Sequence, residues 1–164
     1  MEIFAIALIL ATFLCSLVAG FLFAFALVAM PGLGNLNNRE FIRAFQVMDR
    51  VIQNNQPLFI LVWAGSVVAL VASIGLGVGR LDGAGWLLLV SAALVYLFGV
   101  QLPTRAVNIP LNNKLQTLDV DTTDEDSIQA ARKVFEPRWN RWNSIRTILA
   151  CLASLLLIIL LFSL

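Results

Sequence analysis

Residues 3–29 read IFAIALILATFLCSLVAGFLFAFALVA and contain no charged side chain. A helix needs about 20 consecutive apolar residues to cross the ~30 Å hydrocarbon core of a bilayer, and this stretch is long enough. Three further stretches of the same kind lie at 57–79, 83–102 and 145–164, the last being uncharged from Thr147 onward. The sequence therefore predicts four membrane-spanning helices.

The composition of the whole chain also indicates a membrane protein. Hydrophobic residues make up 60% of the chain and charged residues 13%, whereas a soluble domain usually has about 25% charged residues. The net charge of +1 indicates no nucleic acid partner, so the lipid bilayer is the expected partner. The first stretch lacks the basic segment of a signal peptide, so we interpret it as a retained helix. We predict an all-α integral membrane four-helix up-down bundle, formed as a single domain over 1–164.

Lys and Arg are distributed unevenly between the two sides that four alternating helices define. One side holds both termini and the turn at Arg80, and the other holds the segments 30–56 and 103–146. Loops rich in Lys and Arg stay in the cytoplasm, so we expect both large loops to be cytoplasmic and both termini to be non-cytoplasmic. The basic residues of the second side are Arg39, Arg43, Arg50, Arg105, Lys114, Arg132, Lys133, Arg138, Arg141 and Arg146.

Small residues recur at every fourth position of the first two predicted spans. Small side chains at this spacing let helix backbones approach closely in lipid, where the hydrophobic effect does not drive association. We expect them to pack the four helices tightly; the alternative is that one stripe forms the contact face of a homo-oligomer. The two stripes are Ala7, Ala11, Cys15 and Ala19, and Gly65, Ala69, Ser73 and Gly77.

The sequence contains no histidine. This excludes haem, zinc, copper and non-haem iron sites that use histidine ligands, as well as Ser-His and Cys-His catalytic pairs. The two cysteines, Cys15 and Cys151, both fall inside predicted spans, where a lone cysteine usually acts as a small hydrophobic residue. We therefore expect no disulfide, no metal site and no cofactor.

The first large loop is predicted to contain an amphipathic surface helix. The tripeptide at 30–32, Met-Pro-Gly, predicts the end of the first helix. Asn37 or Asn38 can then cap a new helix over 38–53, whose apolar residues recur on one face while its arginines lie on the other. This pattern is typical of a helix that lies at the membrane surface.

The second large loop is predicted to contain a second surface helix. Pro103 and Pro110 predict that no regular helix forms at its start, because proline removes a backbone donor. Thr123 or its neighbour, followed by three acidic residues, predicts a helix start and a helix over 123–135. Pro137 then suits the first turn of a new helix that runs into the last span.

Three residues at the start of that last helix share one face: Trp139, Asn143 and Arg146 lie at positions i, i+4 and i+7. Arg146 lies at the membrane edge, where a desolvated arginine must find partners. We expect it to contact at least one asparagine of the same side, with Trp139 and Asn143 lining the same cavity. The alternative is that the asparagines only cap helices and satisfy loop backbone. They are Asn54, Asn55, Asn108 and Asn112.

Four sequence elements together resemble one known family. They are MPGL at 30–33, FQVMDRVIQNN at 45–55, VNIPLNN at 107–113 and WNRWNSIRT at 139–147. These elements resemble the anthrone oxygenase-like family of small four-helix membrane proteins, formerly a domain of unknown function, and the resemblance covers nearly the whole chain. Most bacterial members are of unknown function, and the location expected for this chain is the bacterial inner membrane. Fungal members with an assigned role oxidise anthrones to anthraquinones with molecular oxygen.

The resemblance implies that the chain binds or oxidises a lipophilic aromatic small molecule with O2 and no metal. An anthrone ionises to a phenolate-like anion that can pass an electron to O2, so the protein needs to bind the ring, stabilise the oxyanion and accept a proton. Arg146 would stabilise the oxyanion and Asp49 would be the base, although Asp49 could instead pair with Arg43 or Arg50. The expected substrate-binding residues are Asn54, Asn55, Asn108, Asn112, Trp139 and Asn143.

Two alternatives stay open. Phe21, Phe23 and Phe25 either wall an aromatic pocket or contact lipid. The chain as a whole is either such a binder or oxidase, or a non-catalytic membrane protein, a transport or assembly partner, whose asparagine and arginine motifs are structural. The predicted spans carry no charge, which argues against an ion-coupled transporter.

Overall fold

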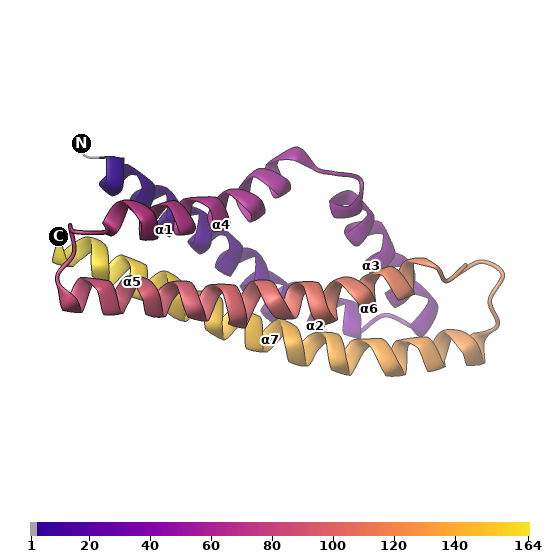
Figure 1. Cartoon of the computed structure of the whole chain (residues 1–164). Coiled ribbons are helices and arrows are strands. Elements are labelled where there is room, and N and C mark those ends of the chain that lie inside the picture. The colour runs from indigo at the N-terminus through magenta and orange to yellow at the C-terminus, as the bar shows by residue number, and fades with distance from the viewer. Residues whose placement is uncertain (1–2) are drawn as a thin grey trace.

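The computed structural model describes residues 3–164; 88% of the chain is helical, and the described part contains no strand (Figure 1). Three short segments, η1 to η3, are π-helical, with wider turns than an α-helix. The elements in chain order are α1 Ile3–Ala24, η1 Phe25–Ala29, α2 Met30–Gly34, α3 Asn38–Gln53, α4 Pro57–Gly77, α5 Gly83–Tyr96, η2 Leu97–Gln101, η3 Thr104–Asn108, α6 Ile109–Gln116 and α7 Glu125–Ser163.

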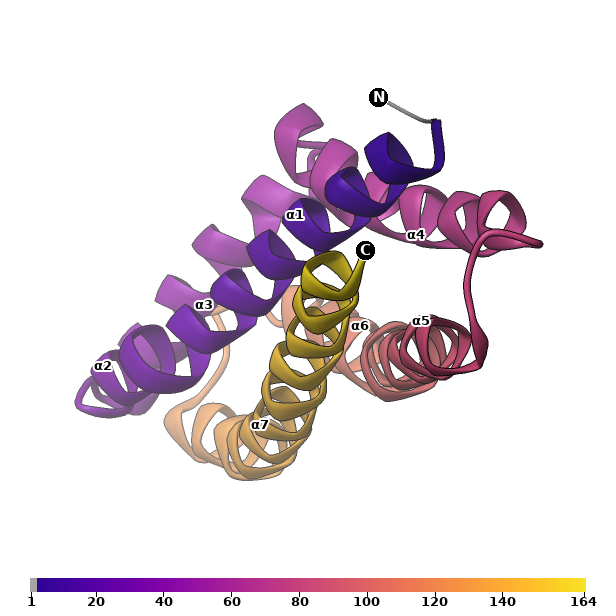
Figure 2. The ribbon, with the colours of Figure 1, turned by 90° about the vertical axis from the view of Figure 1, so that its left-hand side faces the viewer.

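Within residues 3–164, four helical stretches are long and apolar enough to cross a membrane. They are Ile3–Gly34, Pro57–Gly77, Gly83–Gln116 and Glu125–Ser163. Consecutive stretches run in opposite directions, and the start of α1, the α4–α5 turn and the end of α7 lie at the same end of the molecule (Figure 1). Figure 2 shows α1 between α4 and α7, and α5 beside α7. The arrangement confirms the predicted four-helix up-down bundle and indicates a lipid bilayer environment.

The bundle core is packed through small residues where α1 meets α4. A Cβ atom added to Gly65 would lie 3.2 Å from Leu14, and one added to Gly77 would lie 3.3 Å from Phe4. The two predicted small-residue stripes thus contribute to packing inside the chain. The fully buried large side chains of this bundle core include Leu8, Leu22, Leu70, Leu89, Tyr96, Leu157 and Leu160.

The other side of the bundle is formed by α5 and η2 packed on α7. They approach closely at Gly99, where an added Cβ atom would lie only 2.6 Å from Leu149. Between α4 and α5, in contrast, packing contact is slight. A hydrogen bond of 2.7 Å between the Ser66 and Tyr96 hydroxyls joins these two helices, so a polar contact links them where apolar packing is sparse.

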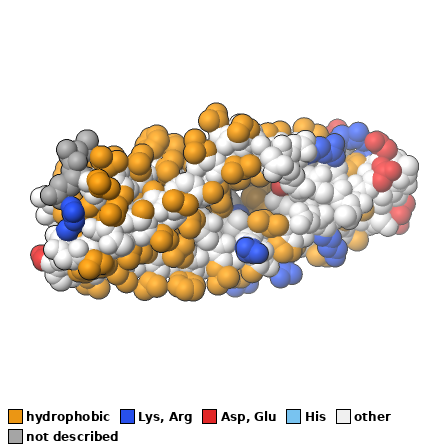
Figure 3. Space-filling model, turned by 45° about the horizontal axis from the view of Figure 1, so that its top comes forward, with side chains coloured by type: hydrophobic (Ala, Val, Ile, Leu, Met, Phe, Trp, Pro, Cys, Tyr) orange, Lys and Arg blue, Asp and Glu red, His pale blue; other side chains and the backbone are white. Residues whose placement is uncertain are grey.

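A second core lies at the opposite end from the termini. It is formed by α3, α6 and the start of α7. α3 confirms the predicted helix over 38–53. Its N-terminus is capped by Asn37, whose side-chain oxygen accepts a 2.9 Å hydrogen bond from the Glu40 backbone N–H. Most charged side chains also gather toward this end (Figure 3). The buried residues of this polar-end core are Met30, Phe41, Ile42, Phe45, Leu111, Leu115, Val120, Ile128, Phe135 and Trp139.

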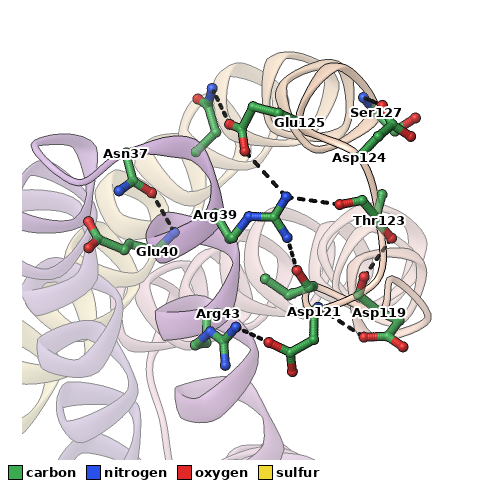
Figure 4. Close-up of polar contacts among 12 residues, drawn as sticks. Asn37, Arg39, Glu40, Arg43, Asp119, Asp121, Thr123, Asp124, Glu125 and Ser127 are labelled. Carbon is green, nitrogen blue, oxygen red and sulfur yellow. Dashed lines mark hydrogen bonds and ion pairs between the residues drawn. The ribbon is translucent and has the colours of Figure 1, made fainter.

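Two arginines of α3 hold the α6–α7 loop (Figure 4). The Arg39 guanidinium donates to the backbone carbonyls of Val120 and Thr123, the latter at 2.9 Å, and lies 3.4 Å from the Glu125 carboxylate. Arg43 pairs with Asp121. Because α3 forms one wall of the polar-end core, these contacts fix the loop against it.

The structure corrects two predictions about proline. The first helix does not end at Pro31 but continues to Gly34, and the segment around Pro103 and Pro110 is helical rather than irregular. Each of these prolines lies two residues after a π-helical segment. Proline lacks an N–H and its ring collides with the carbonyl four residues earlier; the wider π-turn displaces that carbonyl, so the helix can continue.

The start of the last helix also differs from the prediction. Pro137 does not begin a new helix, because α7 runs without a break from Glu125 to Ser163. Packing on both sides of Pro137, by the buried Phe135 and Trp139, compensates the lost backbone hydrogen bond. The N-terminal cap is Asp124, which accepts from the Ser127 N–H at 2.9 Å, and not a threonine. At about 1.5 Å per residue, α7 is roughly twice as long as the bilayer core.

Candidate functional site: a cavity between the two cores

A cavity of about 260 Å³ lies where the bundle core meets the polar-end core. Figure 3 shows a hollow at this level, between the hydrophobic surface and the polar end. Five segments line the cavity: α1 with η1, α3, α4, η3 with α6, and α7. Its polar lining residues are Asp49, Gln53, Thr104, Asn108, Asn112, Asn113, Asn143 and Arg146, and its aromatic ones are Phe21, Phe25, Phe45, Phe59, Trp63 and Trp139.

The aromatic side chains form continuous walls. The Phe21 ring centroid lies 4.9 Å from that of Phe25 and 5.4 Å from that of Phe59. Phe59 stacks on Trp63 with ring centroids 5.2 Å apart. The Trp139 ring centroid lies 5.8 Å from that of Phe25 and extends the same set of rings toward α7. Aromatic rings arranged in this way offer flat apolar faces to a planar ligand. Two of the three phenylalanines considered from the sequence, Phe21 and Phe25, line the cavity, whereas Phe23 is half exposed.

Arg146 forms a buried polar cluster with Thr104 and Asn143. It is only 4% exposed, and it donates to the Thr104 hydroxyl at 2.8 Å and to the Asn143 side-chain carbonyl at 3.0 Å. The Asn143 amide in turn donates to the Leu22 carbonyl at 3.1 Å. Among residues 3–164, no carboxylate lies within ion-pair distance of Arg146. The positive charge is therefore buried with neutral partners only.

Asp49 forms the second polar cluster, with Gln53, Asn112 and Gln116. Its carboxylate accepts hydrogen bonds from the Asn112 amide at 2.8 Å, from Gln53 at 2.6 Å and from Gln116 at 3.0 Å. It is 5% exposed, and its described partners include neither Arg43 nor Arg50. A carboxylate has about four acceptor positions. The three amides therefore orient Asp49 and leave about one acceptor position for a further donor.

Trp139 lies between the Arg146 cluster and the Asp49 cluster. Its indole N–H donates to the Asn112 side-chain carbonyl at 2.9 Å, and its ring lies 5.9 Å from the Arg146 guanidinium carbon. Because Asn112 also donates to Asp49, one chain of contacts runs from Arg146 across an aromatic face to the carboxylate. The cavity thus joins a cation, a flat apolar wall and an anion.

One polar side chain of the lining, Asn108, is buried without a hydrogen bond. It is 2% exposed, and neither its amide nitrogen nor its carbonyl oxygen bonds to any residue within 3–164. The Nε of Arg146 is likewise buried without an acceptor. A buried polar group left unpaired costs about 1–3 kcal/mol, so these atoms mark the part of the cavity where a ligand oxygen would be stabilised.

Six of the eight predicted site residues line this one cavity: Asp49, Asn108, Asn112, Trp139, Asn143 and Arg146. Asn54 and Asn55 do not. Asn54 ends α3 as its C-terminal cap, and Asn55 takes a positive φ of 59° in the following turn, a conformation that asparagine tolerates better than most residues.

The predicted partners of Arg146 were wrong. Its hydrogen bonds go to Thr104 and Asn143 instead of Asn54, Asn55, Asn108 or Asn112. Because η3 continues into α6, Asn108 and Asn112 lie about one turn apart on one helical stretch, and Asn112 is held by Asp49 and Trp139. The expected polar cavity exists, but its asparagines are divided between the two clusters.

The sequence interpretation also missed several residues. Gln53 lies four residues after Asp49 and Gln116 four after Asn112, so each is one helical turn from its neighbour. That spacing is visible in the sequence, but it carries weight only if 104–116 is read as a helix. Thr104, the partner of Arg146, lies directly after Pro103 and gives no sequence signal of its role.

A helical bundle with an aromatic cavity and a buried arginine defines a class of membrane proteins rather than an activity. The chain belongs to the anthrone oxygenase family, whose model matches residues 44–156, and this confirms the resemblance found in the motifs. The match includes both polar clusters, whereas Phe21 and Phe25 of the aromatic wall precede it. Neither the curated proteins nor the solved structures compared with the chain give a match.

Proposed function

We propose that the cavity binds a planar, lipid-soluble aromatic molecule and oxidises it with molecular oxygen, without a metal or organic cofactor. One observation carries the proposal: the Arg146 cation is buried beside aromatic walls, with no carboxylate partner among the described residues. Burying a charge is costly unless a counter-charge is present, and an anionic ligand oxygen would supply one. Membership of the anthrone oxygenase family supports the same class of ligand.

The proposed reaction converts an anthrone and O2 into an anthraquinone and water. A base removes a proton from the CH2 group, which leaves an anion whose charge lies largely on the former carbonyl oxygen. That anion gives one electron to O2, and the resulting radical and superoxide combine at the same carbon. The peroxide takes up the proton and loses water, which leaves the second carbonyl. The anthrone loses four electrons and O2 gains four.

The two clusters have complementary roles in this reaction. Arg146 would stabilise the developing oxyanion, and a preorganised donor of this kind typically contributes about 10²–10³ in rate. Asp49, oriented by three amides, would accept the proton. Trp139 and the phenylalanine walls would stack on the rings, and Asn108 would donate its unpaired amide to a ligand oxygen.

The test uses the full chain reconstituted in vesicles, with 9(10H)-anthrone as the probe. O2 uptake is measured with an electrode and anthraquinone by absorbance, and one O2 is expected per quinone formed. Arg146→Met should lower the rate by about 10²–10³, because the oxyanion loses its cation. The matched control is Arg141→Met, an exposed position of the same helix, which should keep the wild-type rate.

The outcomes separate the two functional alternatives. O2 uptake no faster than in protein-free vesicles, together with saturable binding of an aromatic probe, would favour the non-catalytic membrane protein. An Arg146→Met variant that oxidises anthrone at the wild-type rate would remove Arg146 from the mechanism. Asp49→Asn should also lose activity while it keeps probe binding, because an amide cannot accept the proton.

We also propose that the polar end faces the cytoplasm of a bacterial inner membrane, with both termini outside. The excess of Lys and Arg in the two large loops supports this orientation. A periplasm-active reporter fused after Leu164 should be active, and the same reporter placed in the α6–α7 loop should not be. The reverse pattern would overturn the orientation.

A further inference from the structure

Around the cavity, packing is sparse between α4 and the η3–α6 segment. α4 packs mainly on α1 and touches α5 only lightly, whereas α3 packs on α6 and on α7. No comparable packing joins α4 to η3 or α6. Phe59 and Trp63 of α4 and Ile109 and Asn113 of α6 nevertheless line the same cavity, so they face each other across a boundary that packing does not close.

On either side of this sparsely packed region, hydrogen bonds join the elements that line the cavity. Toward the polar end, Asn112 and Gln116 of α6 bind Asp49 of α3 at 2.8 and 3.0 Å, and Gln53 lies 3.3 Å from Asn113. Toward the middle of the bundle, the Trp63 indole donates to Gln101 at 2.9 Å. No hydrogen bond of the described residues joins Phe59 or its neighbours in the first turn of α4 to η3 or α6.

The rim of this sparsely packed region has two chemical faces. Ile109 is 45% exposed and, with Phe59 and Ile52, gives it an apolar edge. Gln53 and Asn113, both exposed, give it a polar edge toward the loops. A rim that is apolar toward the bundle and amide-rich toward the loops matches the boundary between acyl chains and headgroups, where aromatic molecules with one polar edge concentrate.

We propose that ligands reach the cavity sideways from the bilayer, at the depth of the headgroups, between Phe59 and Ile109. This inference rests on the proposed function in one respect, the planar aromatic ligand. It adds that the ligand is taken from the membrane phase, and that Phe59 and Ile109 determine which ligands pass. A planar aromatic confined to water by a permanent charge is then excluded, even where its ring would fit the cavity.

The first experiment measures association in vesicles of phosphatidylcholine and phosphatidylglycerol with 1-hydroxyanthraquinone, a planar probe that needs no oxidation. Quenching of tryptophan fluorescence reports binding, since Trp63 and Trp139 line the cavity. Lipid is added at constant total probe and protein. The association rate should follow the mole fraction of probe in the lipid. A rate that follows the free aqueous concentration would overturn the proposal, as would saturable binding of anthraquinone-2-sulfonate from water.

The second experiment narrows the opening with Ile109→Trp. A bulkier rim should slow association and dissociation of 1-hydroxyanthraquinone together, each by about tenfold, and leave Kd within about twofold. Leu102→Trp is the matched control, because Leu102 is similarly exposed on the same helical stretch but does not line the cavity. Phe59→Ala should speed both rates, and dissociation more than association, because Phe59 also belongs to the aromatic wall and its loss weakens binding. Unchanged rates in both rim variants would contradict the lateral route.

The two proposals fail separately. Membrane-dependent probe binding without O2 uptake from anthrone would leave the lateral route intact and remove the oxidation. Oxidation of anthrone with association set by the aqueous concentration would do the reverse. No saturable binding of 1-hydroxyanthraquinone under any lipid condition would overturn the lateral route outright.

Discussion

The bundle core and the polar-end core are built on different physical principles, although α7 passes through both. The bundle core relies on close backbone approach at Gly65, Gly77 and Gly99, and its helices carry large apolar side chains on their outer faces as well as inside. The polar-end core has an amphipathic helix, a cluster of aromatic residues and arginines that bind a loop. The bundle core suits lipid, where close packing drives helix association. The polar-end core suits an aqueous boundary, where the burial of apolar surface drives association. The cavity lies where the two meet.

The largest expected contrast comes from truncating one residue in each core. Phe41→Ala should cost about 3–5 kcal/mol in the unfolding free energy of the polar end, because Phe41 is fully buried and carries Arg132 4.3 Å above its ring. Leu70→Ala should cost less than half as much, since lipid is as apolar as the bundle core. Hydrogen exchange of α3 and α4 amides measures both. Equal effects would show that the two cores do not differ in this way.

A pair of glycines tests the close packing of the bundle core. Gly99→Ala should destabilise the protein by about 1–3 kcal/mol, because the new methyl group would lie 2.6 Å from Leu149. Gly20→Ala meets nothing within 4 Å and should be neutral or stabilise the helix by up to about 1 kcal/mol. Thermal unfolding in detergent, followed by circular dichroism, compares them. A neutral Gly99→Ala would mean that η2 and α7 can move apart freely.

The loop-binding arginines give a smaller effect at the polar end. Arg39→Gln should weaken the hold on the α6–α7 loop by about 1–2 kcal/mol, because charged hydrogen bonds to two carbonyls are lost. Arg43→Gln removes an exposed ion pair with Asp121 and should cost less than about 1 kcal/mol. Limited proteolysis within 117–124 measures loop release. If Arg43→Gln released the loop more than Arg39→Gln, the backbone contacts in Figure 4 would not be the dominant ones.

The smallest expected effect is the pH dependence of the Asp124 cap. The Ser127 backbone N–H donates to this exposed carboxylate and lowers its pKa below the ordinary value. Since the folded pKa is lower than the unfolded one, the cap stabilises the first turn of α7 above about pH 4, and this contribution is lost as the pH falls through the folded pKa. Asp124→Asn should abolish that pH dependence in hydrogen exchange of residues 125–128. An unchanged profile would contradict the capping role.

The sequence was sufficient for the features that depend on composition and local pattern. Four long uncharged stretches predict four spanning helices, because a helix satisfies its own backbone hydrogen bonds in lipid. Asn37 and the amphipathic repeat predict α3 at its observed bounds. The spacing of Trp139, Asn143 and Arg146 places them on one face, and all three line the cavity.

The remaining features depend on helix continuity, which the prolines obscured. Pro103 and Pro110 suggested an irregular loop, so Asn108, Asn112 and Gln116 were not seen as successive turns of one helix. The π-turn that accommodates a proline depends on the carbonyl geometry of the preceding turn, and local sequence does not fix it. The division of the asparagines between Arg146 and Asp49 follows from tertiary packing, which a residue pattern does not show.

The π-helical segments have a consequence for how such a site can be gained or lost. An α-helix advances each residue by about 100°, and a π-turn accommodates one extra residue without breaking the helix. Deleting a single residue within η3 would restore a regular helix and rotate everything after it by about that angle. Asn112 and Gln116 would then turn away from Asp49 with no side chain replaced. The length of this segment, as much as its chemistry, therefore encodes the site, and single-residue insertions and deletions are a route by which relatives of this chain can diverge.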